Sequence, residues 1–165
     1  MSELPRLTAS RAVGLGLAAS SAIIAAVYYF QYVVGLAPCE LCLWQRKPHY
    51  AVIALAALTL AGVASGRIRT LATPLVLMTV LYLAAAGLGL LHVGVEQHWW
   101  PSPVGCSGGG DNTDPATILT DILRAPIVRC DAVAWSLFGI SMAGYNVLIS
   151  LVLAGLMLTG LRSRR

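Results

Sequence analysis

Four long stretches without a charged residue dominate the chain. Between Arg11 and Glu40 lie 28 uncharged residues, and stretches of 19, 26 and 30 uncharged residues follow along the sequence. A helix needs about 20 mostly apolar residues to cross a bilayer, and its backbone polar groups must be satisfied within the helix itself. The pattern therefore predicts an all-α membrane protein, a single four-helix transmembrane bundle with spans at about 12–34, 43–64, 71–95 and 143–161.

Composition supports a lipid environment. Of the 165 residues, 58% are hydrophobic and 11% are charged, against about 25% charged residues in ordinary globular proteins. This excludes a disordered chain, which would be poor in apolar residues. The net charge is +4 with no basic patch interleaved with aromatic residues, so no nucleic-acid partner is expected. The apolar surplus is too large for the interior of so short a chain, and the bilayer is its expected surroundings.

Lys and Arg are distributed unequally between the segments that join the spans. The two tails and the middle connection hold seven of the eleven basic residues and one acid, Glu3. Cytoplasmic segments of membrane proteins carry an excess of Lys and Arg, so both termini are expected in the cytoplasm. The other two loops, about 35–47 and 96–141, are then expected on the periplasmic side of a bacterial inner membrane.

All four cysteines lie in these two outward loops: Cys39, Cys42, Cys106 and Cys130. Cysteines that serve as small apolar core residues would be scattered through the spans instead. The outer side of the inner membrane is also a compartment in which disulfides persist. Their segregation therefore points to thiol chemistry.

Cys39 and Cys42 form a CxxC motif at the outer edge of the second span. If the chain is helical from about Cys39, the two sulfurs share one face, and Arg46 follows on that face four residues after Cys42. The helix N-terminus and the guanidinium both favour the thiolate, which is the form that attacks disulfides and electrophiles. A static local disulfide, or half of a zinc site, would show the same spacing.

Cys106 and Cys130 are separated by 23 residues. A zinc site built on the CxxC motif would want a second close pair, so we predict no metal ligand. Two structural disulfides remain an alternative, because an even number of cysteines outside the cell is usually structural. The run Ser107–Gly110 directly after Cys106 would give that sulfur freedom to reach a partner. This feature favours an electron relay between two cysteine pairs.

The rest of the long loop carries signals of the membrane surface. Four aliphatic residues at helical spacing predict a short amphipathic helix over 115–123 that lies in the interface plane. Trp99, Trp100 and Trp135 are typical of an interfacial aromatic belt. Such anchoring would hold Cys130 close to the first loop.

Three motifs together resemble the DsbB family of inner-membrane quinone reductases, which regenerate oxidised DsbA. They are the run PCELCLWQR that ends at Arg46, a Trp-Pro-Ser-Pro run that leads to Cys106, and Arg129-Cys130-Asp131. The resemblance covers nearly the whole chain, with four spans, inward termini and one cysteine pair in each outward loop. It implies a redox-active role for all four cysteines.

The resemblance also implies an order of electron transfer. Cys106 and Cys130 would take electrons from a periplasmic DsbA-like oxidase of the thioredoxin fold, with Cys106 forming the mixed disulfide. Cys39 would pair transiently with Cys130, and Cys42 would face a membrane quinone, ubiquinone or menaquinone, beside Arg46. An acceptor of high potential is needed because DsbA is itself a strong oxidant, at about −120 mV.

Two polar residues near the outer ends of the spans bear on the quinone site. An intramembrane histidine is a functional candidate, so His92 is expected to bind the quinone with Arg46, whereas His49 is a weaker candidate. Gln45 departs from the acidic residue that some relatives carry at this place. Tyr145 and Asn146 are predicted to be helix-packing residues.

The main interpretation is a disulfide-generating, quinone-reducing membrane oxidoreductase. The competing class is a structural or transport membrane protein that is stapled by disulfides and has no redox turnover. A transporter is expected to carry charges within its spans, and the apolar centres of these spans have none. This absence favours the enzyme.

Overall fold

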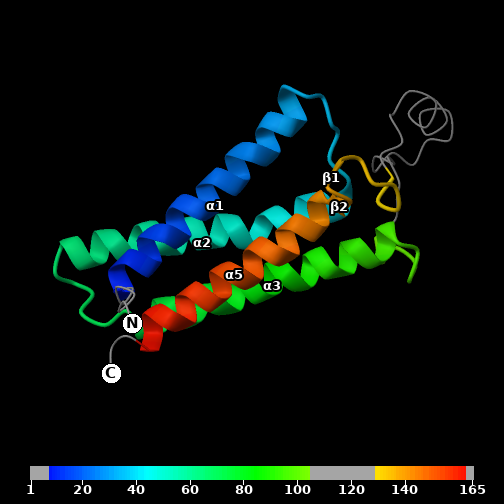
Figure 1. Ribbon diagram of the computed structural model, residues 1–165. Helices are drawn as coiled ribbons and strands as arrows, with labels where there is room; N and C mark the ends of the chain where they lie inside the picture. The colour runs from blue at the N-terminus through cyan, green and yellow to red at the C-terminus, as the bar shows by residue number, and fades with distance from the viewer. Residues whose placement is uncertain (1–7, 105–128, 163–165) are drawn as a thin grey trace, which may run out of the picture.

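The computed structural model describes residues 8–104 and 129–162. Its main elements are four helices that run along one another (Figure 1): α1 (Ala9–Tyr32), α2 (Glu40–Ala64), α3 (Ala72–Glu96) and α5 (Met142–Arg162). All four are long and apolar enough to cross a membrane, which confirms the predicted four-helix membrane protein. Each helix begins and ends within three residues of the span predicted for it.

The helix boundaries follow local chemistry. Cys39 is the N-cap of α2, where its sulfur accepts a hydrogen bond from the backbone N–H of Cys42 at 3.3 Å. This cap starts the helix at Glu40, three residues before the predicted span. At the other end α2 stops before Gly66, whose φ of 69° suits glycine and not a helix.

The half of the bundle that carries the termini is closely packed. Its core consists of side chains from all four helices, which include Val13, Val52, Leu75, Met78, Tyr82, Leu153 and Met157. Small residues let the helices approach, because a Cβ added at Gly160 would lie 2.7 Å from the Ala12 side chain. Such close approach by small residues stabilises helix pairs in membranes, where burial from water supplies no driving force.

Toward the opposite end, α1 diverges from α5, whereas α3 and α5 stay side by side (Figure 1). A two-stranded hairpin, β1 (Ser136–Leu137) and β2 (Ile140–Ser141), precedes α5 at this end. Phe138 and Gly139 form its turn with φ values of 50° and 79°, as the right-handed twist of a two-residue hairpin requires. No sequence pattern predicted these strands, which have two residues each and leave the fold class all-α.

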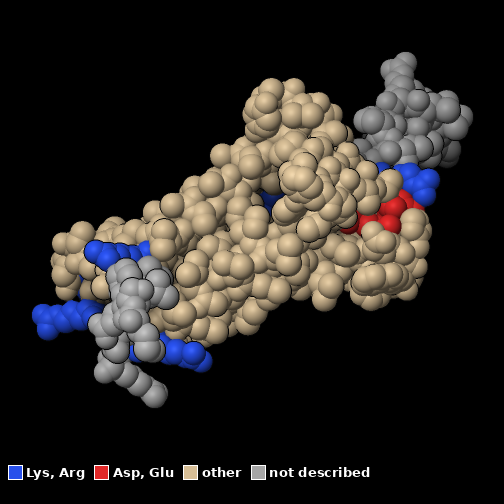
Figure 2. Space-filling view, viewed as in Figure 1, with Lys and Arg blue, Asp and Glu red and all other residues tan. Residues whose placement is uncertain are grey.

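The surface is divided by charge. Figure 2 shows most Lys and Arg side chains at the end that carries the termini, basic and acidic side chains together at the opposite end, and between them a wide band with only a small basic patch in a hollow. Among the described residues, the exposed basic ones at the end with the termini are Arg11, Arg67, Arg69 and Arg162. A wide, nearly uncharged band is what a helix bundle must offer to the hydrocarbon core.

The predicted interfacial features have different outcomes. The amphipathic helix expected over 115–123 lies outside the described residues, as does Cys106. Trp99 is 64% exposed, as an interfacial residue would be. Trp135 is only partly exposed and packs against Phe30 of α1, with ring centroids 5.1 Å apart.

Candidate active site

The CxxC motif lies at the first turn of α2, where the sequence placed it. The sulfur atoms of Cys39 and Cys42 are 2.9 Å apart, and Cys39 is only 5% exposed. The N-cap position aims the Cys39 sulfur at the unpaired N–H groups of the first helical turn. The pair is therefore held at the positive end of the helix dipole, as predicted.

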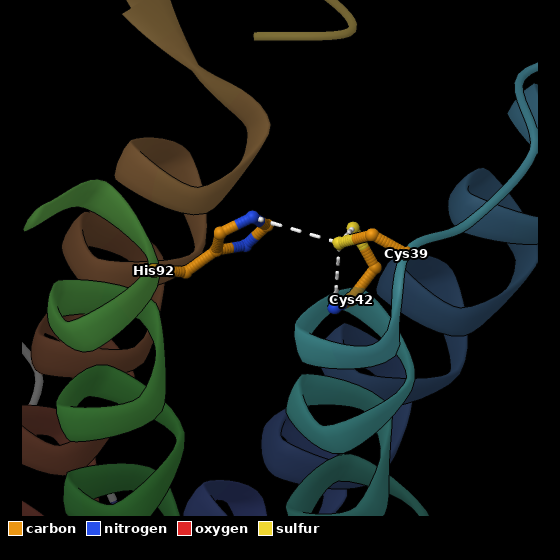
Figure 3. Close-up of side chains that lie close together, drawn as sticks. All are labelled: Cys39, Cys42 and His92. Atoms are coloured by element: carbon orange, nitrogen blue, oxygen red, sulfur yellow. Dashed lines mark hydrogen bonds between the residues drawn. The ribbon is translucent and has the colours of Figure 1, made fainter. Parts of the chain in front are cut away.

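His92 faces the cysteine pair from the neighbouring helix. Figure 3 shows its imidazole reaching from α3 across to the start of α2, with the Nε2 atom 3.6 Å from the Cys39 sulfur. The ligand atoms of Cys39, Cys42 and His92 all lie within 4.8 Å of one another. This set could hold a metal ion only when both cysteines are reduced, and within residues 8–104 and 129–162 no fourth ligand completes it. A closed structural zinc site requires four protein ligands.

The structure brings Cys130 to the same place. Its side chain is 1% exposed and belongs to one apolar cluster with Cys39, Leu41 and Val95. The backbone of Cys130 also lies within hydrogen-bonding reach of the His92 ring. Three of the four cysteines, from loops that are about 90 residues apart in sequence, thus meet at one site. This is consistent with the expectation that Cys130 lies near the first loop.

Arg46 points inward. The residue is 8% exposed, its Nη1 atom donates to Gln31 Oε1 at 2.7 Å, and its guanidinium lies 5.4 Å from the centre of the Tyr28 ring. Both partners come from the last turns of α1. The sequence reasoning missed them, although a lone amide such as Gln31 within an apolar stretch was a usable signal.

Cys39, Cys42, Arg46 and His92 all line one cavity of about 320 Å³. Its walls are mostly apolar side chains of α1 and α5, together with Trp135 and its neighbours. The side chains that carry chemistry converge on one side of it: Cys39, Cys42, Arg46, His92 and Glu96. A concave, apolar site with a few converging polar groups is the usual form of a small-molecule pocket.

A second set of polar residues forms the inner wall of this cavity. Gln45, His49 and Asn146 all line it, and all three are hydrogen-bonded to one another or to His92. Asn146 was predicted only as a helix-packing residue, yet it joins α5 to Gln45 at 2.7 Å and to His49 at 3.0 Å. Across the described residues, the buried nitrogen and oxygen atoms of side chains all have hydrogen-bond partners.

The site also perturbs the acidity of groups at its mouth. The hydrogen bond with Cys42, and then burial, raise the pKa of the Cys39 thiol to about 12, while the hydrogen bond with His92 acts in the opposite direction. In the dithiol state Cys39 therefore keeps its proton at neutral pH. At the exposed rim, the Arg129 guanidinium, 2.7 Å from the Asp131 carboxylate, lowers the pKa of Asp131 to about 2.

Comparison with known proteins identifies the chain's relatives. The sequence model of the family described as Disulfide bond formation protein DsbB matches residues 9–160. The chain is 34% identical to Disulfide bond formation protein B of Verminephrobacter eiseniae (strain EF01-2), over 96% of this chain and 91% of the relative.

Two further relatives are similar over most of their length. The protein of the same name from Acidovorax sp. (strain JS42) is 34% identical over 90% of this chain and 84% of its own. Disulfide bond formation protein B 2 of Pseudomonas entomophila (strain L48) is 30% identical over 90% and 88%. No solved structure is significantly similar to the chain.

Proposed function

The chain belongs to the DsbB family of disulfide bond formation proteins, and from this premise we propose that it oxidises a periplasmic DsbA-like protein and reduces a membrane quinone. The observation that carries the proposal is the cavity on which a cysteine pair, a guanidinium and an imidazole converge. Its volume of about 320 Å³ and apolar walls suit the ring of a quinone, ubiquinone or menaquinone. The tail would lie toward the lipid.

The cysteine pair, Arg46 and His92 have distinct tasks in this proposal. The quinone supplies an acceptor for two electrons and two protons. Cys42 is the sulfur that donates the electrons, and the formation of its bond with Cys39 completes their release. Arg46 has donors beyond the one that binds Gln31, and these would bind a carbonyl oxygen that gains negative charge. His92 would hold the Cys39 sulfur.

The second cysteine pair would connect this site to the soluble partner. Cys106 forms a mixed disulfide with the DsbA-like protein, and Cys130 passes the electrons on through a transient bond with Cys39. The position of Cys130 in the same apolar cluster as Cys39 supports the second step. The apolar walls keep water away from the exchange.

Orientation is part of the proposal, because disulfide formation requires an oxidising compartment. We place the termini in the cytoplasm and the cysteine loops in the periplasm of a bacterial inner membrane, on the strength of the basic end in Figure 2. Reporter fusions test it: those after Arg69 or Arg165 should be active only in the cytoplasm, and those at Gly109 only outside. A cytoplasmic signal at Gly109 would exclude the relay.

The activity itself is tested with purified protein, a reduced DsbA-like protein and ubiquinone-1 or menadione, by following quinone absorbance. We expect catalytic loss of oxidised quinone that requires both the protein and the reduced partner. A protein that shows no such loss, yet unfolds when its cysteines are reduced, would instead belong to the disulfide-stapled structural class.

A further inference from the structure

A continuous chain of hydrogen bonds leads from the backbone of α3 to the Cys39 sulfur. The Nδ2 atom of Asn146 donates to the Ala85 carbonyl at 3.3 Å and to Gln45 Oε1 at 2.7 Å. The Nε2 atom of Gln45 lies 2.7 Å from His92 Nδ1, and His92 Nε2 lies 3.6 Å from the sulfur. This hydrogen-bond chain therefore joins residues of α3, α5 and α2 before it reaches the cysteine pair.

The Ala85 carbonyl, the first member of this hydrogen-bond chain, sets the direction of the bonds that follow it. A backbone carbonyl can only accept, so the amide nitrogen of Asn146, and not its oxygen, must face Ala85. The second proton of the same NH₂ group then points to Gln45, which must present its oxygen. Gln45 is thus left with its NH₂ group toward His92, and His92 Nδ1 can only accept.

A second anchor prevents the Asn146 amide from turning over. Its oxygen accepts from His49 Nε2 at 3.0 Å and from Ser150 Oγ at 3.3 Å. His49 is 1% exposed and Ser150 is fully buried, so neither could find a replacement partner in water. A flipped amide would set its oxygen against the Ala85 carbonyl, and it would also require His49 to move its ring proton and the Ser150 hydroxyl to reverse its hydrogen bond.

We propose that Gln45 and Asn146 are positioning residues that fix His92 as its Nε2–H tautomer, so that the ring proton is on the nitrogen that faces the Cys39 sulfur. A neutral histidine carries one ring proton, and with Nδ1 held as an acceptor that proton is on Nε2. The inference rests on the proposed function in one respect, namely that Cys39 acts as a leaving group in the relay.

The step that benefits is the release of Cys39 from Cys130. A Cys106 thiolate attacks the sulfur of Cys130, the Cys106–Cys130 bond forms, and the Cys39–Cys130 bond breaks. The electron pair of the broken bond stays on the Cys39 sulfur, which leaves as a thiolate. Exchange is faster when the leaving sulfur is stabilised as a thiolate, and a hydrogen bond from His92 Nε2–H supplies that stabilisation.

The tautomer can be read directly by nitrogen NMR of the protein in detergent micelles, with ¹⁵N in the histidine rings. The chain has three histidines, so a His92→Gln variant identifies the relevant signals. In the wild type we expect His92 Nδ1 without a proton and Nε2 with one. In Gln45→Glu, measured at a pH at which the glutamate is ionised, the carboxylate can only accept, so Nδ1 should become protonated. A protonated Nδ1 in the wild type, or no change in Gln45→Glu, would overturn the proposal.

Ser150→Ala is the matched control for this experiment. It removes one of the two hydrogen bonds to the Asn146 oxygen but reverses no donor, so the His92 spectrum should stay as in the wild type. Asn146→Leu removes the element that orients Gln45, and there we expect a mixture of both His92 tautomers. A pure Nε2–H spectrum in Asn146→Leu would contradict the role given to Asn146.

A second readout follows the Cys39 sulfur without quinone or partner. In a protein whose other three cysteines are serine, alkylation of Cys39 should be about tenfold slower at pH 8 when Gln45 is replaced by Met. In the wild type Cys42, Glu96 and Cys130 face His92 as well. The two proteins compared carry the same residues at these three positions, so they differ only at Gln45. Equal alkylation rates in the two proteins would contradict the proposal. If the quinone assay showed no activity while the NMR and alkylation results were as expected, only the proposed function would be excluded.

Discussion

The two ends of this bundle use the same four helices for opposite purposes. At the end that carries the termini, the helices converge on a core of buried apolar side chains around Met78 and Met157. At the cysteine end, α1 swings away from α5 (Figure 1), and here polar side chains line part of a cavity of about 320 Å³. At the closed end, which carries the termini, a substitution that reduces side-chain volume should lower the stability of the fold. At the open end, which carries the cysteines, a substitution that removes a functional group should lower the activity.

The largest expected effect is at the open end. Cys42→Ser changes one atom of a partly buried side chain, so we expect the thermal midpoint of the oxidised or reduced protein to change little. Quinone reduction should nevertheless fall by at least about 1000-fold, because a hydroxyl cannot form the disulfide that releases the electrons. Steady-state quinone absorbance measures the loss.

The same variant also separates the two cysteine pairs. Cys106 and Cys130 should still accept electrons from one equivalent of reduced partner. If the Cys42→Ser protein instead unfolded, and the two half-reactions were not separated, the cysteine pair would be needed for the stability of the fold. The distinction between the two ends would then not hold.

The converse substitution is at the closed end. Met78 is fully buried in the core, against Gly16 of α1. Met78→Ala should lower the free energy of unfolding by about 2–5 kcal/mol, because it removes contacts and leaves a cavity. Denaturation in mixed micelles measures this, and the folded fraction should keep the wild-type turnover. A loss of turnover at unchanged stability would show that the closed end takes part in the chemistry.

The helices, and the residues that are placed by spacing along a single helix, are the parts that the sequence predicted well. Long apolar stretches fix where helices form in lipid, since the hydrogen-bond requirement admits no alternative, and each helix lies within three residues of its predicted bounds. The CxxC motif placed Cys39 and Cys42 at a helix start for a similarly local reason. Spacing along one helix also placed Arg46 on the side of Cys42, and both line the cavity.

What the sequence did not predict depends on contacts between helices. Gln31, Gln45 and Asn146 come from three different helices, and no periodicity in one helix indicates which amide will meet which. The hairpin at Phe138–Gly139 was missed because its strands have two residues each, too few for an alternating pattern. The wall of the cavity is therefore a property of the assembled bundle.

Arg46 tests how much of the open end's chemistry depends on charge. Arg46→Ala should raise the KM for quinone and lower turnover, with a loss in kcat/KM of about 10- to 100-fold, because the carbonyl loses a charged donor. Arg46→Lys should restore only part of it, since an ammonium keeps the charge but not the planar fork. Exchange between Cys106–Cys130 and the partner should be nearly unchanged.

Lys47 is the matched control for Arg46. It is the next residue, it is also cationic, but it is exposed and lies over the Trp44 ring at 5.5 Å instead of lining the cavity. Lys47→Ala should leave both kinetic parameters unchanged. If the Arg46 and Lys47 variants behaved alike, Arg46 would be a membrane anchor and not part of the quinone site.

The smallest expected effect is at Tyr82, where the two regions meet. Its fully buried ring belongs to the closed core, yet its hydroxyl donates to the Gly16 carbonyl at 3.0 Å and lies 2.9 Å from Ser20 Oγ, which in turn approaches His49 Nδ1 at 3.4 Å. Tyr82→Phe keeps the ring and removes only the hydroxyl. Hydrogen bonds between membrane helices contribute about 0.6 kcal/mol on average and up to about 1.7 kcal/mol, so the free energy of unfolding should fall by about 1 kcal/mol.

The KM for quinone should stay at the wild-type value, because His49 keeps its bond to Asn146 and the donor order toward His92 is unchanged. A raised KM in Tyr82→Phe would mean that the polar wall of the cavity extends into the closed half, and the boundary between the two regions would have to be drawn below Tyr82.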